Sequence, residues 1–271
     1  MSGKFTHYLI TRFNVPVKNW DKDKAGKQTL DESWMKDRMW LFTTYCVPTI
    51  IHQTQADFQW LVYCDQYTDP VHLDSLHIEV QKVPGAQVRV VTDFTALLID
   101  LRELLSSAPT PFVITSRVDN DDGIGTSYIH DIQANFIPED KTIINLNGGI
   151  LFDLQQRIMT RFKNVKLNHY GSLIEVTDPR GGYLTVLGYP HHQPPEEANV
   201  VNVPCRFGWL KIIHSRNLKS RTSGIPVLPR RTLVHFGLKR NAFPISVTNT
   251  ILYTLQRLST IIKRNVMPGR K

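Results

Sequence analysis

The chain has 271 residues, of which 41% are hydrophobic and 10% aromatic, and a formal net charge of +8. This length and composition predict one large domain or two small ones and exclude wholesale disorder. The sequence contains no run of about 18 apolar residues, so no transmembrane helix is predicted. The N-terminal stretch is too short and too polar for a signal peptide. Cys46, Cys64 and Cys205 lack metal-finger spacing and predict free thiols in a reducing cytosol.

The first half of the chain alternates apolar strand-like runs with helical patterns. The four predicted strands are His7–Val15, Phe58–Asp65, Gln87–Phe94 and Pro111–Val118. One helix is predicted from a capping box, with Thr29 three residues before Glu32, and Pro48 interrupts or restarts it. A second helix, Ala96–Leu105, carries a leucine stripe. This alternation predicts an α/β protein with a parallel sheet.

In the second half the pattern changes to shorter strands and glycine-rich turns. Strand-like runs at 142–159, 172–178 and 181–189 predict a mixed or antiparallel extension, and 190–204 is predicted to be loop. A last helix over Val247–Asn265 forms a C-terminal helical appendage. Its apolar side consists of Ile251, Leu252, Leu255, Leu258 and Ile262.

Positive charge is concentrated late in the chain, because no Asp or Glu follows Lys211 while Lys and Arg recur to the last residue. Such a block is typical of a solvated basic surface, of contact with acidic membrane lipid, or of an anionic substrate. Nucleic acid is the weaker choice, because base-stacking aromatic residues are not interleaved among the charges.

Polar side chains gather where the predicted parallel strands end, which is where ligands bind in open α/β sheets. The first strand ends with Thr11, Arg12 and Asn14, and the second with Asp65. The fourth runs into the sequence SRVDNDD, residues 116–122.

Asp119 and Asp121 flank one residue, so both carboxylates can address one centre, and hard oxygen ligands suit Mn²⁺ or Mg²⁺. The alternative is an ordinary acidic turn. Asp122 alternatively caps a helix that begins near residue 124 or 126.

Several stretches resemble one enzyme family. HYLITRFNVP, YCVPTIIHQTQADFQWLVYCDQYTD, SRVDNDD, SLIEV and GWLKIIHSRN, in that order, resemble the rhamnosyltransferase family of nucleotide-sugar glycosyltransferases. The resemblance implies a GT-A-like, Rossmann-type sandwich with a mostly parallel central sheet and a small antiparallel extension. The matching stretches extend from about His7 to Asn217. We therefore predict a glycosyltransferase domain over residues 1–217, with a nucleotide-binding half over about 1–123 and an acceptor half over about 124–217. Residues 218–271 are predicted to form a basic C-terminal extension with an amphipathic helix.

The resemblance implies that a sugar is transferred from a nucleoside diphosphate sugar to a hydroxyl of a glycan or lipid-linked acceptor. That the sugar is rhamnose rests on the resemblance alone. The residues expected to bind the nucleotide sugar are Thr11, Arg12, Asp65, Arg117, Asp119, Asn120 and Asp121. The metal, Mn²⁺ or Mg²⁺, is expected at Asp119, Asp121 and His214. Arg117 alternatively pairs with the adjacent carboxylates, and a lone His is more often a surface or core residue.

An inverting transfer requires a general base, for which Glu175, Asp178 and His191 are the candidates. Each has a structural alternative: Glu175 as a charge at a strand edge, Asp178 as a turn residue and His191 as a polar loop residue. Trp209 either stacks on the acceptor sugar or is a core aromatic. Residues 217–221 are candidates for a lid over the phosphates.

The C-terminal helix either lies on the inner face of a membrane, as suits a cytoplasmic enzyme of polysaccharide biosynthesis with a lipid-linked acceptor, or docks its apolar stripe onto the catalytic domain. Two other functions stay open. A sugar-nucleotide nucleotidyltransferase also needs a carboxylate pair, but the segment 14–27 has only one glycine for a triphosphate loop. A non-catalytic basic binding module would not require Asp119 or Asp121.

Overall fold

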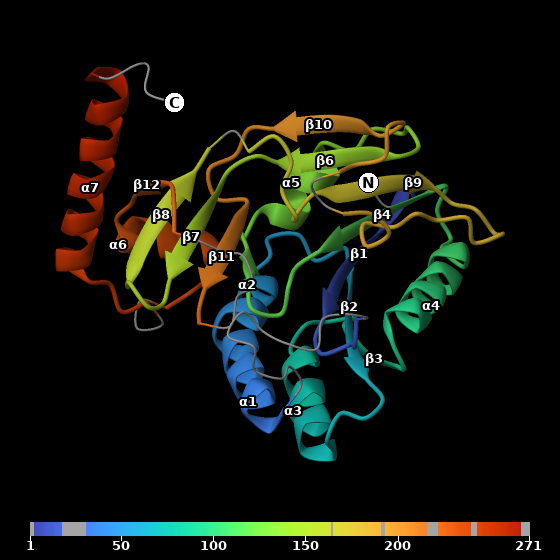
Figure 1. The fold of residues 1–271 in the computed structure, drawn as a ribbon. Coiled ribbons are helices and arrows are strands. Elements are labelled where there is room, and N and C mark those ends of the chain that lie inside the picture. Colours follow the sequence, from blue (N-terminus) through green and yellow to red (C-terminus); the bar gives the residue numbers. More distant parts are fainter. Residues whose placement is uncertain are drawn as a thin grey trace.

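The computed structural model describes residues 3–17, 31–163, 165–190, 193–215, 222–239 and 243–266, with the side chains of Arg230 and 260–266 outside the description. Its larger sheet has seven strands in the order β10-β6-β9-β4-β1-β2-β3 (Figure 1). These strands are β1 (Phe5–Arg12), β2 (Gln59–Asp65), β3 (Gln87–Val91), β4 (Phe112–Arg117), β6 (Thr142–Leu146), β9 (Ser172–Val176) and β10 (Asn199–Val203). Only β9 runs antiparallel to its neighbours in this sheet, which confirms the predicted mostly parallel sheet.

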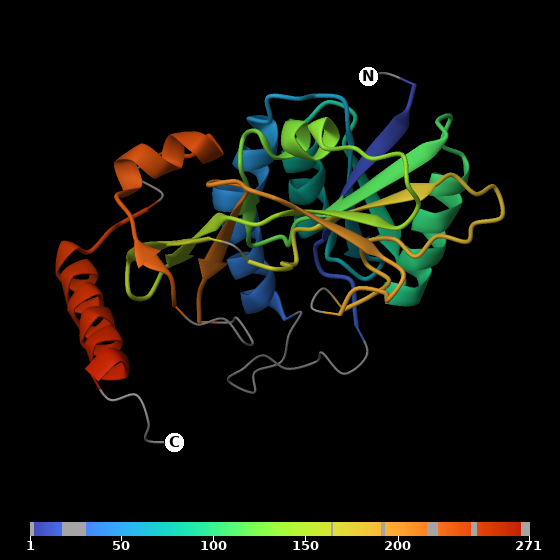
Figure 2. The ribbon, with the colours of Figure 1, turned by 90° about the horizontal axis from the view of Figure 1, so that it is seen from above.

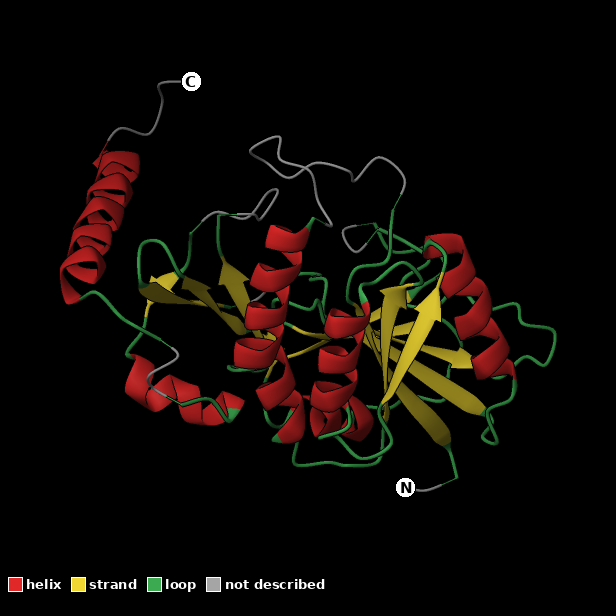
Figure 3. Cartoon of the chain, turned by 90° about the horizontal axis from the view of Figure 1, so that it is seen from below, coloured by secondary structure: helices red, strands yellow, loops and turns green. Residues whose placement is uncertain are grey.

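Helices cover both faces of this sheet. One face packs against α1 (Glu32–Leu41), α3 (Pro70–Val80) and α5 (Tyr128–Ala134), and the other against α4 (Phe94–Ser106). Figure 3 shows the strands between α4 and the other helices. Asp31, Asp69 and Asp93 cap α1, α3 and α4, each accepting a hydrogen bond from a backbone N–H of the first turn. A side-chain oxygen at this position satisfies a donor that the helix itself leaves unpaired.

The predicted interruption at Pro48 takes a specific form. The chain continues from α1 through a π-helical turn, η1 (Phe42–Cys46), into α2 (Val47–Ile51), where Pro48 occupies the first turn. A proline lacks the N–H and clashes with the carbonyl four residues earlier, and a wider turn just before it accommodates both defects. The buried side chains of Phe42, Tyr45 and Ile50 keep this segment packed on the core.

A second sheet of five strands has the order β12-β8-β7-β11-β5. Its strands are β5 (Gly123–Ile124), β7 (Gly149–Asp153), β8 (Ile158–Phe162), β11 (Trp209–Ile213) and β12 (Ile225–Pro226), and only β7 and β11 pair in parallel. It packs on the short helices α6 (Pro229–Thr232) and η2 (Leu233–Phe236). The last helix, α7 (Val247–Val266), stands beside it (Figure 2). This sheet is the predicted small extension.

Three parts of the sequence pattern were misread. The stretch 181–189, predicted as a strand, is a loop, and β10 lies inside the predicted loop 190–204. The helix α3 was not predicted. Strand β12 lies beyond the predicted boundary at residue 217 and pairs with β8, so residues after that boundary complete the second sheet. The division of the chain at 217 stays a prediction.

Candidate active site

The carboxyl ends of β1, β2 and β4 bring the predicted donor-site residues to one edge of the sheet. Ile10 pairs with Arg117 and Arg12 with Tyr63, so Arg12 lies level with the turn that follows β4. Asp65, the last residue of β2, lies on the other side of β1. At about 4.8 Å per strand, β2 and β4 are roughly 10 Å apart, a separation that a nucleotide can span.

Asp121 is buried in this turn and bound by two nitrogen-containing side chains. Its Oδ2 accepts a hydrogen bond from Arg38 Nη1 at 2.5 Å and lies 2.8 Å from His214 Nε2. Burial raises the pKa of Asp121, but Arg38 and His214 outweigh it and hold the pKa below its ordinary value. The structure therefore brings His214 to Asp121, as the sequence suggested, but it also places the unpredicted Arg38 there.

Asn120 fixes the backbone of the turn. Its Nδ2 donates to the carbonyl oxygen of Phe13 at 2.5 Å, and its Oδ1 accepts from Arg38 Nη1 at 3.1 Å. Asn120 is buried, so this amide joins the end of β1, helix α1 and the acidic turn. Both polar ends of its side chain are used within the protein, which makes it a positioning residue rather than a direct ligand.

Asp122 does not cap a helix, contrary to the prediction. Helix α5 begins only at Tyr128, and the buried Asp122 carboxylate instead accepts from Tyr170 Oη at 2.7 Å and from the backbone N–H of Ile212 at 2.8 Å. His169 Nε2 lies 3.3 Å from it and Lys211 Nζ 3.8 Å. Asp122 thus connects the acidic turn to β11 of the second sheet.

Asp119 is the acidic residue of the turn that the protein leaves most available. In the described part of the chain its carboxylate accepts no hydrogen bond, and part of its surface is exposed. Burial raises its pKa, but the positive charges of His169 and Arg117 lower it below its ordinary value. An ionised carboxylate that accepts no hydrogen bond from the described residues is the natural ligand for an incoming cation.

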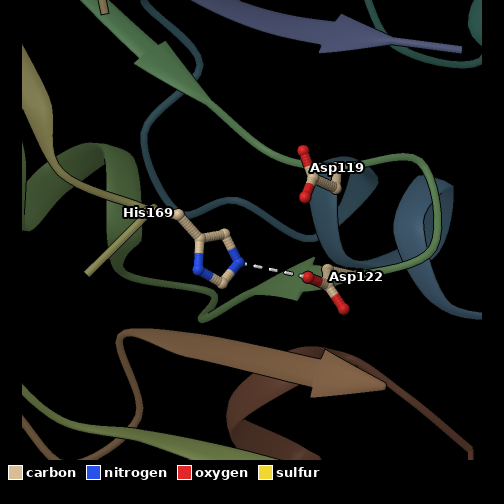
Figure 4. A group of neighbouring side chains, drawn as sticks. All are labelled: Asp119, Asp122 and His169. Carbon is tan, nitrogen blue, oxygen red and sulfur yellow. Dashed lines mark hydrogen bonds and ion pairs between the residues drawn. The ribbon is translucent and has the colours of Figure 1, made fainter. Parts of the chain in front are cut away.

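Asp119, Asp122 and His169 each offer an atom to a common centre, and these atoms lie within 4.8 Å of one another. Figure 4 shows the His169 ring pointing toward Asp122 with Asp119 beside it. Two carboxylates and an imidazole suit Mn²⁺ and, with water completing the shell, Mg²⁺. This group differs from the predicted set of Asp119, Asp121 and His214. Asp121 and Asp122 both already have partners within the protein.

Permanent positive charges surround the three carboxylates. Four cationic side chains lie close enough to the turn to interact electrostatically with its carboxyl groups, and these are Arg12, Arg38, Arg117 and Lys211. Burial lowers the pKa of Lys211, but Asp122, Asp119 and Asp121 raise it above its ordinary value. Arg117 is held in place because its Nε donates to the carbonyl oxygen of His169 at 2.7 Å. With four such cations against three carboxylates, the site attracts anions.

Thr11 does not line a pocket as predicted. Its side chain is fully buried, and its hydroxyl accepts a hydrogen bond from Trp60 Nε1 at 3.0 Å. Trp209 likewise differs from its predicted role in acceptor binding. It is 5% exposed, stacks on Tyr170 with ring centroids 5.3 Å apart, and lies against Gly149, where any side chain would collide with its ring. Both residues belong to the core, where an apolar strand most often places them.

Glu175 and Asp178 lie at the wrong edge of the sheet for a general base. Glu175 pairs with Val113, near the start of β4, which puts it about 13 Å of strand away from Arg117. Its two oxygens accept from the backbone N–H groups of Leu184 and Thr185 at 2.7 and 3.0 Å. Asp178 follows β9 still further from the acidic turn and pairs with Arg180. His191 and residues 217, 219 and 221 lie outside the described residues, so their predicted roles stay predictions.

Sequence reasoning missed Arg38, His169 and Lys211. They come from α1, from the loop before β9 and from β11, and no local motif links them to the acidic turn. Lys211 did leave a signal, because it is the one charged residue in the apolar run WLKII. A lysine that extends from a largely buried strand requires a negative partner.

Comparison with known proteins gives the class of enzyme. A family model described as "Putative rhamnosyl transferase" matches residues 6–225. The chain belongs to this family of glycosyltransferases. No curated protein matches.

Solved structures of S. aureus TarS are distantly similar. The complex of TarS 1–349 with UDP has a TM-score of 0.42 and 13% identity and covers 77% of this chain and 60% of that one. The complex with UDP-GlcNAc has a TM-score of 0.41 and 12% identity, and covers 79% and 60%. HddC from Yersinia pseudotuberculosis has a TM-score of 0.36 and 11% identity, and covers 73% and 90%. The chain spans less than two thirds of the TarS chains.

Proposed function

We propose that this protein is a GT-A-type enzyme that transfers a sugar from a nucleoside diphosphate sugar to an acceptor hydroxyl of a glycan or lipid-linked glycan. The observation that carries the proposal is the acidic turn after β4, which meets four permanent cations at the carboxyl edge of a parallel sheet. A diphosphate brings negative charge, and this edge offers an excess of positive charge to receive it. The family description supports rhamnose as the transferred sugar.

Three cationic side chains are assigned to the diphosphate, and one carboxylate to the nucleoside. Arg12, Arg117 and Lys211 lie around Asp119, the most available of the three carboxylates. Guanidinium groups bind phosphate oxygens in a fixed bidentate geometry, which orients the leaving group. Asp65, across β1 from this cluster, is assigned to the ribose or base.

The divalent ion, Mn²⁺ or Mg²⁺, is proposed to be held by Asp119 together with Asp122 and His169. When bound, it neutralises the charge that develops on the departing diphosphate. Asp121 is assigned a supporting role, since it lies outside this group of three and pairs with Arg38 and His214. The cationic side chains orient the donor, and the buried residues of the turn keep water away from it.

Of the three residues predicted as general base of an inverting reaction, only His191 is still a candidate, and its role stays a prediction. Glu175 and Asp178 lie too far from the acidic turn to reach an acceptor there.

We also propose a cytoplasmic location at the inner face of the membrane, where a lipid-linked acceptor would be within reach.

A thermal-shift panel of nucleoside diphosphates, their sugars and nucleoside triphosphates, with and without Mn²⁺, tests the function. A ligand at 100 times its Kd stabilises the native state by about 2.7 kcal/mol, which raises Tm by roughly 5 to 10 °C for a chain of this size. Asp119→Asn should lose the Mn²⁺-dependent part of the shift. Asp74→Asn, the same change at an exposed position of α3, should keep it.

Three results would count against the proposal. Failure of every nucleotide to stabilise the protein, with or without metal, would remove the donor site. An unchanged response of Asp119→Asn would favour a basic binding module in which the acidic turn has no role. A response to nucleoside triphosphates alone would instead favour a nucleotidyltransferase.

A further inference from the structure

Helix α7 contacts the rest of the protein through polar side chains. Asn249 Nδ2 donates to the carbonyl oxygen of Gln156 at 2.7 Å. Tyr253 Oη and Arg257 Nη1 both donate to the carbonyl oxygen of Gly224, at 3.2 and 2.6 Å. These three residues are four positions apart, so they share one face of the helix.

The apolar side of α7 faces solvent. We call this side the outer face; its residues are Ile251, Leu252, Leu255 and Leu258, which are 55%, 52%, 57% and 50% exposed. At about 100° per residue their mean direction is opposite to that of the polar contact face. A helix that docks on a globular core normally buries its apolar stripe. Here the orientation is reversed, which excludes the idea that the described part of this stripe packs on the catalytic domain.

The outer face continues into an apolar groove. This groove has a volume of about 1020 Å³ and lies between α7 and the segment that carries α6. Its apolar lining includes Val227, Leu228, Phe243, Ile245, Val247 and Ile251. Leu228 and Val247 are 75% and 71% exposed. Figures 1 and 2 show α7 at the outer side of the second sheet, on the same side of the molecule as α6. The exposed apolar surface is therefore continuous over two elements.

The net positive charge of the protein comes from the C-terminal part of the chain. Of the 32 Lys and Arg, 14 follow Glu197, whereas none of the 24 Asp and Glu does. Arg231 lines the groove, and both Arg231 and Lys239 are exposed. In the described residues no helix is long and apolar enough to cross a membrane. Exposed aliphatic side chains within a purely basic segment are the combination that binds an anionic lipid interface without spanning it.

We propose that the outer face of α7 and the adjoining groove bind the surface of an anionic lipid bilayer. The leucine side chains enter the boundary between headgroups and acyl chains, and basic side chains of this segment, among them Arg231 and Lys239, contact the anionic headgroups. A second copy of the chain is the weaker occupant, because two such basic surfaces repel each other. The proposal does not depend on the donor or on the reaction.

Co-sedimentation of the full chain with vesicles tests the proposal. The protein should sediment with mixed phosphatidylcholine and phosphatidylglycerol vesicles, and binding should fall as salt is raised. Leu252→Glu combined with Leu255→Glu should weaken binding at least tenfold, equivalent to about 1.4 kcal/mol. Ile78→Glu combined with Ile99→Glu is the matched control, since these residues are 63% and 52% exposed on α3 and α4. Its binding should stay within about twofold of wild type.

Three results would overturn the proposal: no sedimentation of the wild type, equal binding to pure phosphatidylcholine vesicles, or equal losses in both double variants. Dimerisation in analytical ultracentrifugation that the leucine variant abolishes, without vesicle binding, would assign the face to a second copy. Thermal melting by circular dichroism checks that each variant folds. The response to nucleoside diphosphates should be the same in all of them, so a failure here is separable from a failure of the donor site.

Discussion

Glu175 is a carboxyl group that the fold keeps almost entirely out of water, with 4% of its surface exposed. Burial raises its pKa from 4.5 to about 7, although two backbone N–H groups donate to it and act in the opposite direction. Below pH 4.5 the group is protonated in both the folded and the unfolded chain and contributes nothing. Between pH 4.5 and 7 the unfolded chain releases the proton first, so the folded state loses stability as pH rises.

Glu175→Gln should therefore change the pH dependence of the free energy of unfolding. Relative to wild type, the variant should gain up to about 3 kcal/mol between pH 5 and pH 8, because it lacks the group that must ionise in a buried place. Urea denaturation at both pH values measures the difference. Parallel pH profiles for the two proteins would contradict a raised pKa at this position.

The same residue shows why some site predictions failed. The sequence places Glu175 in a strand, but only the pairing of β9 with β4 decides at which end of the sheet that strand finishes. Trp209 failed for a related reason, since a glycine in the neighbouring strand β7 lets its ring lie flat in the core. The acidic turn itself could be predicted, because its charges are adjacent in sequence and follow an apolar run.

At the scale of elements, α1 stabilises the acidic turn through one guanidinium group. Arg38 bonds both Asp121 and Asn120, and its charge lies over the Trp34 ring at 5.0 Å from the centroid. The side chains of Arg38 and Asp121 are 13% and 9% exposed, so their ion pair is only weakly screened by solvent. Removal of one partner leaves a buried charge with fewer compensating groups.

Arg38→Met, which keeps much of the side-chain volume, should reduce the free energy of unfolding by about 3 kcal/mol and lower Tm by roughly 6 to 12 °C. Lys36→Met on the same helix breaks only an exposed ion pair with Glu32 and should cost at most about 0.5 kcal/mol. Thermal denaturation of both variants provides the comparison. Equal losses in free energy of unfolding would show that the buried Arg38 ion pair contributes no more than an exposed one. The double variant Arg38→Met with Asp121→Asn should lose less free energy than the sum of the two single changes.

Strands were predicted better than the connections between them. The first four predicted strands correspond to β1 to β4. Of these, β1, β2 and β4 are largely buried and read as apolar runs with a clear signal, whereas β3 lies at the edge of the sheet and is mostly exposed or half-buried. Strand β10, at the other edge, is about as exposed as β3, so the residues before the strand decided the prediction. Its sequence, NVVNV, follows a proline-rich stretch that favours a loop.

For the whole molecule, the C-terminal region divides into a part that completes the core and a part that does not. Leu233, Phe236 and Phe243 are buried against the second sheet. In contrast, described side chains of α7 make polar contacts with Gln156 and Gly224, and its described leucines are exposed. The boundary of structural importance therefore falls between Phe243 and α7.

Truncation after Ser246 should lower Tm by only a few degrees, because a few hydrogen bonds, each worth about 1 kcal/mol, are lost and the entropy of ordering the helix is regained. Truncation after Pro226 should instead prevent stable folding, because it removes three buried side chains whose loss costs several kcal/mol. Differential scanning calorimetry distinguishes the two. Unfolding of the shorter deletion at a much lower temperature would show that α7 is part of the core.

The hydrogen bond from the Ile212 N–H to Asp122 has a use in spectroscopy. An amide proton that donates to a carboxylate resonates at a position set by the charge on that carboxylate, and a cation that arrives at Asp122 withdraws part of this charge. The Ile212 amide signal in a nitrogen–proton correlation spectrum thus reports directly on the acidic turn. A titration with diamagnetic Mg²⁺ or with a donor could be followed at this single resonance before any acceptor is known.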